Sequence, residues 1–159
     1  MSRFYEDIEP GHKIELGSHK FTRDEIIRFA ERFDPQPFHL DEEAAKASLF
    51  GGLCASGWHT ACIWMRLMVQ HEQRLREELV TSGQPAFGYG VSPGFRDLAW
   101  PIPVYVGDVI TYTIEYLEKR ALRSRPGWGL LLHYDEGVNQ NGEVVMSMTT
   151  NLFVARRED

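Results

Sequence analysis

The stretch WHTACIWMRLMVQHEQRLREEL, residues 58–79, constrains the fold most strongly because it is long, helical in pattern and apolar along half its length. Its first half is apolar on nearly every side, and its second half is charged at short intervals. Such a helix is buried at one end and reaches solvent at the other. Every segment after it is strand-like, so a sheet that wraps around the helix is the simplest way to bury its apolar half.

Four strand-like segments follow this helix. Residues 85–100 contain glycines that suit bends or close backbone approach. In residues 103–120, aromatic and aliphatic residues alternate with polar ones, which is typical of a half-buried strand. Residues 127–138 and 143–157 flank the tetrapeptide NQNG, which predicts a hairpin. With one more strand expected at residues 13–21, the fold class is α+β: a single domain over residues 1–159, with an antiparallel sheet wrapped around one long central helix.

Two shorter helices are expected between the first strand and the long helix. Thr22 and Glu25 form a capping-box pattern in front of apolar residues at helical spacing. This helix should end at Asp34, because the residue before a proline is pushed out of the α region. Asp41 is then the expected N-cap of a short helix over residues 42–48.

The segment FDPQPFHLD, residues 33–41, is an unusual connection between helices. Two prolines stiffen it, and it carries both Asp34 and His39. From their spacing alone, the favoured interpretation is a helix-end cap for the aspartate and a buried structural histidine. A rigid turn that fixes a carboxyl and an imidazole also suits proton transfer.

Charge and cysteine content exclude some classes of function. Seventeen Lys and Arg against 23 Asp and Glu give a net charge of -6, which argues against a nucleic-acid partner. Cys54 and Cys62 are predicted to be reduced, buried thiols, as in a cytoplasmic protein. The first residues lack a signal-peptide pattern, and no apolar run approaches the roughly 18 residues of a membrane span, so no membrane association is expected.

The 33 residues RFAERFDPQPFHLDEEAAKASLFGGLCASGWHT, 28–60, resemble the hydratase segment of the MaoC-like dehydratases, the (R)-specific enoyl-CoA hydratases of the hotdog fold. The later PVYVGD, residues 103–108, resembles the turn that precedes a strand in that family. Within the segment, the matching positions are Phe29, Ala30, Asp34, Pro37, His39, Asp41, Ala44 or Ala45, Phe50, Gly51 and Gly57. The departures are Phe33 in place of glycine, Pro35 and Gln36 before the second proline, and Ser56 in place of histidine.

The resemblance implies a hydro-lyase of fatty acid metabolism that needs no cofactor and interconverts a trans-2-enoyl-CoA and an (R)-3-hydroxyacyl-CoA. Asp34 and His39 would hold a water and share the proton transfers, in a division that stays open. The backbone N–H of Gly57 would stabilise the enolate oxygen. Contacts to the substrate are expected from Ser56, Trp58 and Phe50.

Other polar residues carry weaker signals. Asp34, His39, Asp41 and His59 fit no standard zinc spacing, so no metal site is expected. His59 and Thr60 line or support the pocket wall, or belong to the core. The basic residues Lys119, Arg120, Arg123 and Arg125 are interpreted as a solvated strand end in preference to a site for coenzyme A phosphates.

Two alternative functions stay open. A hotdog acyl-CoA thioesterase would use a carboxylate on the central helix, but residues 57–71 contain none and the first is Glu72. The other alternative is a non-catalytic acyl-binding or assembly subunit, against which the presence of both Asp34 and His39 argues weakly. A homodimer or dimer-based oligomer is expected because a wrapped sheet leaves edge strands open.

Overall fold

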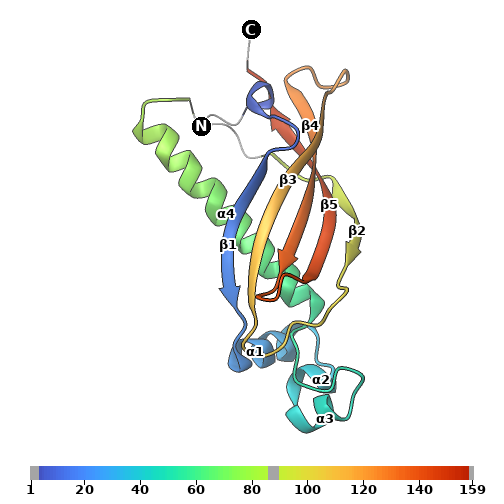
Figure 1. Cartoon of the computed structure of the whole chain (residues 1–159). Helices are drawn as coiled ribbons and strands as arrows, with labels where there is room; N and C mark the ends of the chain where they lie inside the picture. Colours follow the sequence, from blue (N-terminus) through green and yellow to red (C-terminus); the bar gives the residue numbers. More distant parts are fainter. Residues whose placement is uncertain (1–3, 86–89, 158–159) are drawn as a thin grey trace.

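A single antiparallel sheet and one long helix dominate the computed structural model, which describes residues 4–85 and 90–157 (Figure 1). The sheet has the strand order β1-β3-β4-β5-β2, and every neighbouring pair is antiparallel. Its strands are β1 (Lys13–Lys20), β2 (Gly94–Ala99), β3 (Val109–Ala121), β4 (Trp128–Val138) and β5 (Val144–Ala155). The helices are η1 (Tyr5–Asp7), α1 (Arg23–Phe33), α2 (Pro37–Leu40), α3 (Glu42–Lys46) and α4 (Gly57–Thr81).

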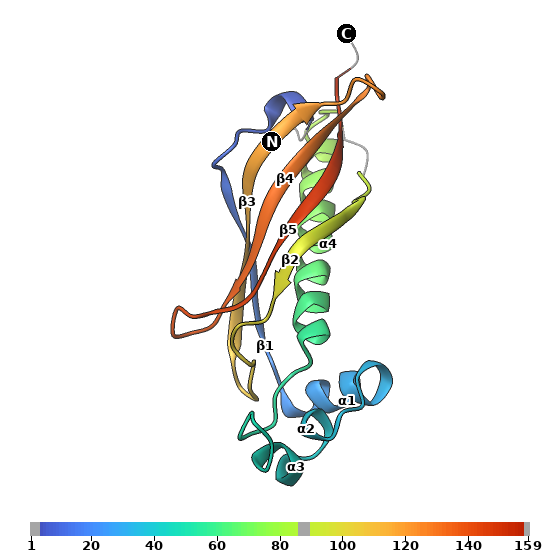
Figure 2. The same cartoon turned by 90° about the vertical axis from the view of Figure 1, so that its right-hand side faces the viewer.

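Helix α4 lies along one face of the sheet, which confirms the expected α+β architecture with one central helix (Figure 2). Strand β3 shows how the sequence pattern produces this packing, because Ile110, Tyr112, Ile114 and Tyr116 are buried while the residues between them are not. The hydroxyl of Tyr112 donates to the carbonyl oxygen of Thr60 over 3.0 Å, which ties α4 to the sheet. The NQNG tetrapeptide joins β4 and β5, as the hairpin signal predicts.

Helices α1, α2 and α3 form a cap at one end of the sheet, beside the beginning of α4 (Figures 1 and 2). Helix α1 ends at Phe33, and Asp41 caps α3 by accepting a hydrogen bond from the N–H of Ala44 at 2.8 Å, both as predicted. The segment 34–56 therefore lies outside the layer that α4 makes with the sheet. Of the helices in the described part of the chain, none is long and apolar enough to cross a membrane.

Four details differ from the sequence-based expectations. The side chain of Thr22 makes no capping bond, and the side chain of Glu25, which would complete the capping box, instead contacts Nε2 of His19 on β1 at 2.5 Å. The connection after α1 is not purely a loop, since Pro37 opens the one-turn helix α2, where its missing N–H costs nothing. Cys54 is buried, as predicted. Cys62 is exposed, because this residue lies on a face of α4 that the rest of the chain does not cover.

The fourth difference concerns residues 85–100, of which only β2 is a strand and 86–89 lie outside the described residues. The expected close backbone approach does occur there at Gly90. A Cβ atom at this position would lie 1.6 Å from the carbonyl oxygen of Phe153, so only glycine fits.

Candidate active site

Asp34 and His39 come together at the cap, as their spacing on a stiff segment predicts. Asp34 follows the last residue of α1, and its N–H donates to the carbonyl oxygen of Ala30 over 3.0 Å. His39 lies in α2, only five residues later. The turn between them brings Nε2 of His39 to 3.5 Å from Oδ2 of Asp34. This separation is longer than a direct hydrogen bond, so a third polar atom can contact both groups.

The orientation of His39 is fixed by its other ring nitrogen. Nδ1 lies 2.8 Å from the carbonyl oxygen of Cys54, and since a carbonyl only accepts, Nδ1 carries the proton. Nε2 is therefore the nitrogen directed at Asp34. The ring is 5% exposed and stacks 6.3 Å from Phe50, which in turn packs 5.0 Å from Phe38. Phe50 thus supports His39 on one side.

The surroundings of Asp34 favour its ionised form. Partial burial raises the pKa of this carboxyl, but hydrogen bonds from Ser56 and Gln36 and the nearby His39 outweigh that effect, so the net pKa is lowered. The amide Nε2 of Gln36 donates to Oδ1 over 2.8 Å. Gln36, which departs from the family pattern, therefore supplies a partner to the carboxylate.

Ser56 connects this carboxylate to the beginning of α4. It is the N-cap of the helix, and its hydroxyl oxygen accepts a hydrogen bond from the N–H of Trp58 at 3.2 Å. With its oxygen so occupied, the hydroxyl proton is available for Asp34. Ser56 is 1% exposed, which leaves it next to the acid and out of open solvent.

Gly57, the predicted oxyanion donor, is the first residue of α4, where backbone N–H groups lack intrahelical partners. In the described residues, no hydrogen-bond acceptor faces its N–H. The indole of Trp100 covers the same glycine so closely that a Cβ would lie 2.5 Å from its ring. The position is thus suited to an anion contact and is also one where close packing requires glycine.

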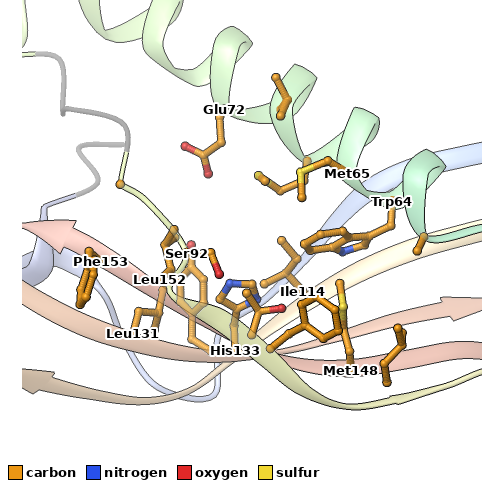
Figure 3. A pocket seen from close by; sticks show the side chains of 18 of the residues that line it. Trp64, Met65, Glu72, Ser92, Ile114, Leu131, His133, Met148, Leu152 and Phe153 are labelled. Atoms are coloured by element: carbon orange, nitrogen blue, oxygen red, sulfur yellow. The ribbon is translucent and has the colours of Figure 1, made fainter. Parts of the chain in front are cut away.

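A cavity of about 420 Å³ lies next to this site, between α4 and the sheet (Figure 3). Trp58, at the start of the helix, lines it and is 52% exposed. Trp58 also packs edge-on against Trp100, with ring centroids 5.3 Å apart. Trp100 covers Gly57 and Trp58 lines the cavity, so the contact between the two indoles links the glycine to the edge of the cavity. A volume of this size is typical of pockets that hold small organic ligands.

Two polar residues of this part of the molecule, His133 and Asp135, were missed by sequence reasoning, and Glu72 was noted only as the first carboxylate of the long helix. Glu72 lies on α4 and His133 on β4, and both line the cavity, with Asp135 buried behind His133. A signal was present, because His133 and Asp135 share the strand face of the buried Leu131 by alternation. Polar residues at the inward-facing positions of a strand indicate a functional site, because ordinary polar residues lie on the outward face.

The other candidates lie elsewhere. His59 belongs to the core, stacked 4.5 Å from Phe29, and burial lowers its pKa to about 4. Thr60 is also buried. The basic cluster begins at the end of β3 that is remote from the cap, where Lys119 donates to the carbonyl oxygen of Tyr5 over 2.9 Å. No group of three or more His, Cys, Asp or Glu side chains in residues 4–85 and 90–157 is arranged to hold a metal ion.

Comparisons with known proteins agree with the fold. A sequence model described as the MaoC like domain matches residues 7–127. The protein YdeM of Bacillus subtilis is 30% identical over 117 residues, which are 74% of this chain and 75% of YdeM. The crystal structure of a MaoC-like dehydratase from Rhodospirillum rubrum is 40% identical with a TM-score of 0.81, and the match covers 99% of this chain and 100% of that one. An (R)-hydratase from A. caviae, involved in PHA biosynthesis, is 22% identical with a TM-score of 0.67 over 92% of this chain and 96% of that chain, which shows a shared fold.

Proposed function

Because the chain belongs to the MaoC-like domain family, we propose that it is a hydro-lyase that adds water to a trans-2-enoyl-CoA and forms the (R)-3-hydroxyacyl-CoA, or runs the reverse reaction. The observation that carries the proposal is the 3.5 Å separation of Asp34 and His39, with the imidazole oriented by Cys54. An ionised carboxylate and an imidazole nitrogen that face one point can hold a water between them.

In this mechanism, the water attacks the β-carbon of the enoyl thioester and loses a proton to Asp34 or His39. A proton is delivered to the α-carbon, so that one water is added overall. Negative charge develops on the thioester oxygen, and the Gly57 N–H at the beginning of α4 is the donor proposed to stabilise it. Ser56 supports Asp34 by a hydrogen bond beside the proposed position of the substrate, and Trp58 and Phe50 are proposed to contact the substrate from two sides.

The proposed occupant of the open side of the cavity is a second copy of the chain. Strand β2 is an edge strand, and the adjacent faces of β2 and α4 expose apolar side chains. Those that also line the cavity are Trp58, Met65, Val69 and Phe95, which are 52%, 47%, 39% and 53% exposed. A homodimer through this face would cover them and close the acyl cavity against water.

A panel of enoyl-CoA and 3-hydroxyacyl-CoA thioesters tests the reaction class. Absorbance of the conjugated double bond reports hydration, a thiol reagent reports release of coenzyme A, and a stereospecific hydroxyacyl-CoA dehydrogenase reports the configuration of the product. We expect loss of the enoyl signal without free thiol, and an (R) product. Thiol release without hydration would instead favour the thioesterase, and inactivity on the whole panel would favour the acyl-binding subunit.

A further inference from the structure

A second polar cluster lies inside the cavity, on strands β4 and β5. Nδ1 of His133 is 2.8 Å from Oδ1 of Asp135, and the hydroxyl of Thr150 donates to Oδ2 of the same carboxylate over 2.6 Å. The three residues are 4%, 0% and 5% exposed. Burying a carboxyl and an imidazole together destabilises the folded state unless the polar atoms of both groups have hydrogen-bond partners.

The imidazole of His133 presents its other nitrogen to the cavity. Nδ1 is engaged by the Asp135 carboxyl, so Nε2 is left over whichever of the two groups carries the shared proton. Figure 3 shows the ring reaching from the sheet into the space below α4, among Ile114, Leu131 and Met148. In the part of the chain that the structure describes, Nε2 has no hydrogen-bond partner. A bound ligand is therefore the natural source of one.

The charges around the cavity limit what that ligand group can be. Burial raises the pKa of Asp135. The hydrogen bonds from His133 and Thr150 oppose this increase, and so does the nearby indole of Trp64, although the N–H of Trp64 makes no hydrogen bond of ordinary geometry. The described lining residues include no lysine or arginine. The one imidazole on the wall, that of His133, is already paired with the Asp135 carboxyl, which leaves no surplus positive charge for an anion.

We propose that His133 binds a hydroxyl group on the tail of the acyl chain, so that the preferred substrates are tail-hydroxylated acyl-CoA thioesters and not plain hydrocarbon ones. A hydroxyl suits the site because it can donate to an unprotonated Nε2 or accept from a protonated one. This inference rests on the proposed function, which puts the thioester at Gly57 and the acyl chain in the cavity. Trp64, which acts on Asp135, is seven residues along α4 from Gly57, or roughly 10 Å.

Binding of saturated acyl-CoA thioesters tests the inference without requiring turnover. Isothermal titration would compare three tails of equal length, ending in methyl, hydroxyl or carboxylate, over chains of roughly four to ten carbons that a cavity of this size accepts. At the best length, we expect the hydroxyl tail to bind at least about tenfold more tightly than the methyl tail. The carboxylate tail should bind more weakly than the hydroxyl tail.

Substitutions then assign the preference to His133. His133→Phe should abolish the preference for hydroxyl over methyl and still bind the methyl tail. His133→Gln, which keeps an amide that donates and accepts, should retain part of the preference and covers the case in which the Phe variant does not fold. Met148→Leu is the matched control, because it changes the same wall by a swap of similar volume and should keep the preference.

The outcomes separate this inference from the reaction class. Hydration of enoyl-CoA thioesters with equal affinity for methyl and hydroxyl tails would overturn the role of His133 and leave the hydro-lyase standing. A hydroxyl preference that depends on His133, without hydration of any thioester, would support the ligand class and overturn the reaction. Tightest binding of the carboxylate tail, or a preference that survives in His133→Phe, would overturn the inference, and no binding of any acyl-CoA would overturn both proposals.

Discussion

The Nδ1 atom of His39 lies 2.8 Å from the carbonyl oxygen of Cys54, and this contact decides which ring nitrogen faces Asp34. The backbone of the segment before α4 thus holds an imidazole that α2 supplies. Because the accepting group is main chain, no side-chain substitution at Cys54 removes it. The orientation of the proposed catalytic pair is therefore carried by the fold of the cap.

The first prediction concerns the proposed joint action of Asp34 and His39. Asp34→Asn and His39→Ala should each lower turnover by roughly 10²- to 10⁴-fold, the usual range for acid–base groups. The double variant should be only slightly worse than the poorer single one, because either loss already abolishes the shared water. Turnover and thermal unfolding would be measured on all four proteins. Near-normal turnover in Asp34→Asn, or single losses that multiply, would falsify the shared-water mechanism.

Ser56→Ala should move the acid limb of the kcat/KM profile to higher pH. The Ser56 hydroxyl helps to lower the pKa of Asp34, so its removal makes the carboxylate harder to ionise. The variant also loses the N-cap of α4, at a cost of about 1 kcal/mol in the free energy of unfolding. Ser82→Ala, which removes a hydroxyl at the other end of the same helix, is the control that should leave the profile in place. An unmoved acid limb in Ser56→Ala would contradict the contact.

Gly57→Ala separates the packing role of this glycine from its proposed contact with the thioester. The new methyl would overlap the indole of Trp100, which should lower the free energy of unfolding by roughly 1–3 kcal/mol. In a Trp100→Ala background, the stability cost should disappear, whereas turnover should stay roughly tenfold or more below that of Trp100→Ala alone, because the methyl still blocks the thioester. If the double variant instead matches Trp100→Ala in turnover, the glycine serves packing only.

His59 should make the protein sensitive to mild acid. Its pKa is about 4 in the folded protein and about 6.5 when exposed, so the unfolded chain takes up the proton first. Stability is then lost as the pH falls from about 6.5 toward about 4. Between about pH 7 and pH 5, the wild type should lose about 2 kcal/mol more than His59→Phe, as measured by urea unfolding. His12→Asn, a change at an exposed histidine, should keep the wild-type slope. An equal slope in His59→Phe would contradict the assignment.

The proposed dimer predicts a mass of about twice 18.3 kDa by light scattering at micromolar concentration. Phe95→Glu should shift the protein toward the monomer, because it places a carboxylate on the apolar face of β2. Leu117→Glu is the control, since Leu117 is 44% exposed but lies on β3, away from that face. A wild-type monomer that keeps its activity would rule out the dimer.

Periodicity made the main elements readable from the sequence. Strand β3 buries every second residue from Ile110 to Tyr116, and α4 buries one side of its first half, because each contributes one side to the same apolar core. Local patterns were less predictive where a distant segment offers an alternative hydrogen-bond partner. Glu25, for example, contacts His19 on β1 with the side chain that a capping box would direct at the backbone of Thr22. The cover that Trp100 places over Gly57 joins positions 43 residues apart, and no local pattern encodes it. Asp34 and His39 were singled out as a catalytic pair because residues 28–60 resemble a known family, since their spacing alone favoured structural roles, whereas His133 and Asp135 were passed over as ordinary strand residues.

The separation of the cap from the layer of helix and sheet has a consequence for how such a protein can be modified. The proposed reacting groups are contributed by residues 34–57, and the wall that would sort acyl tails is contributed by the rest of α4 and by four strands. Substitutions at Met148 or Leu152 can therefore reshape what is accepted without touching Asp34, His39 or their supports. A laboratory selection for new substrates should accumulate its changes on β4, β5 and the later turns of α4, and leave the cap unaltered.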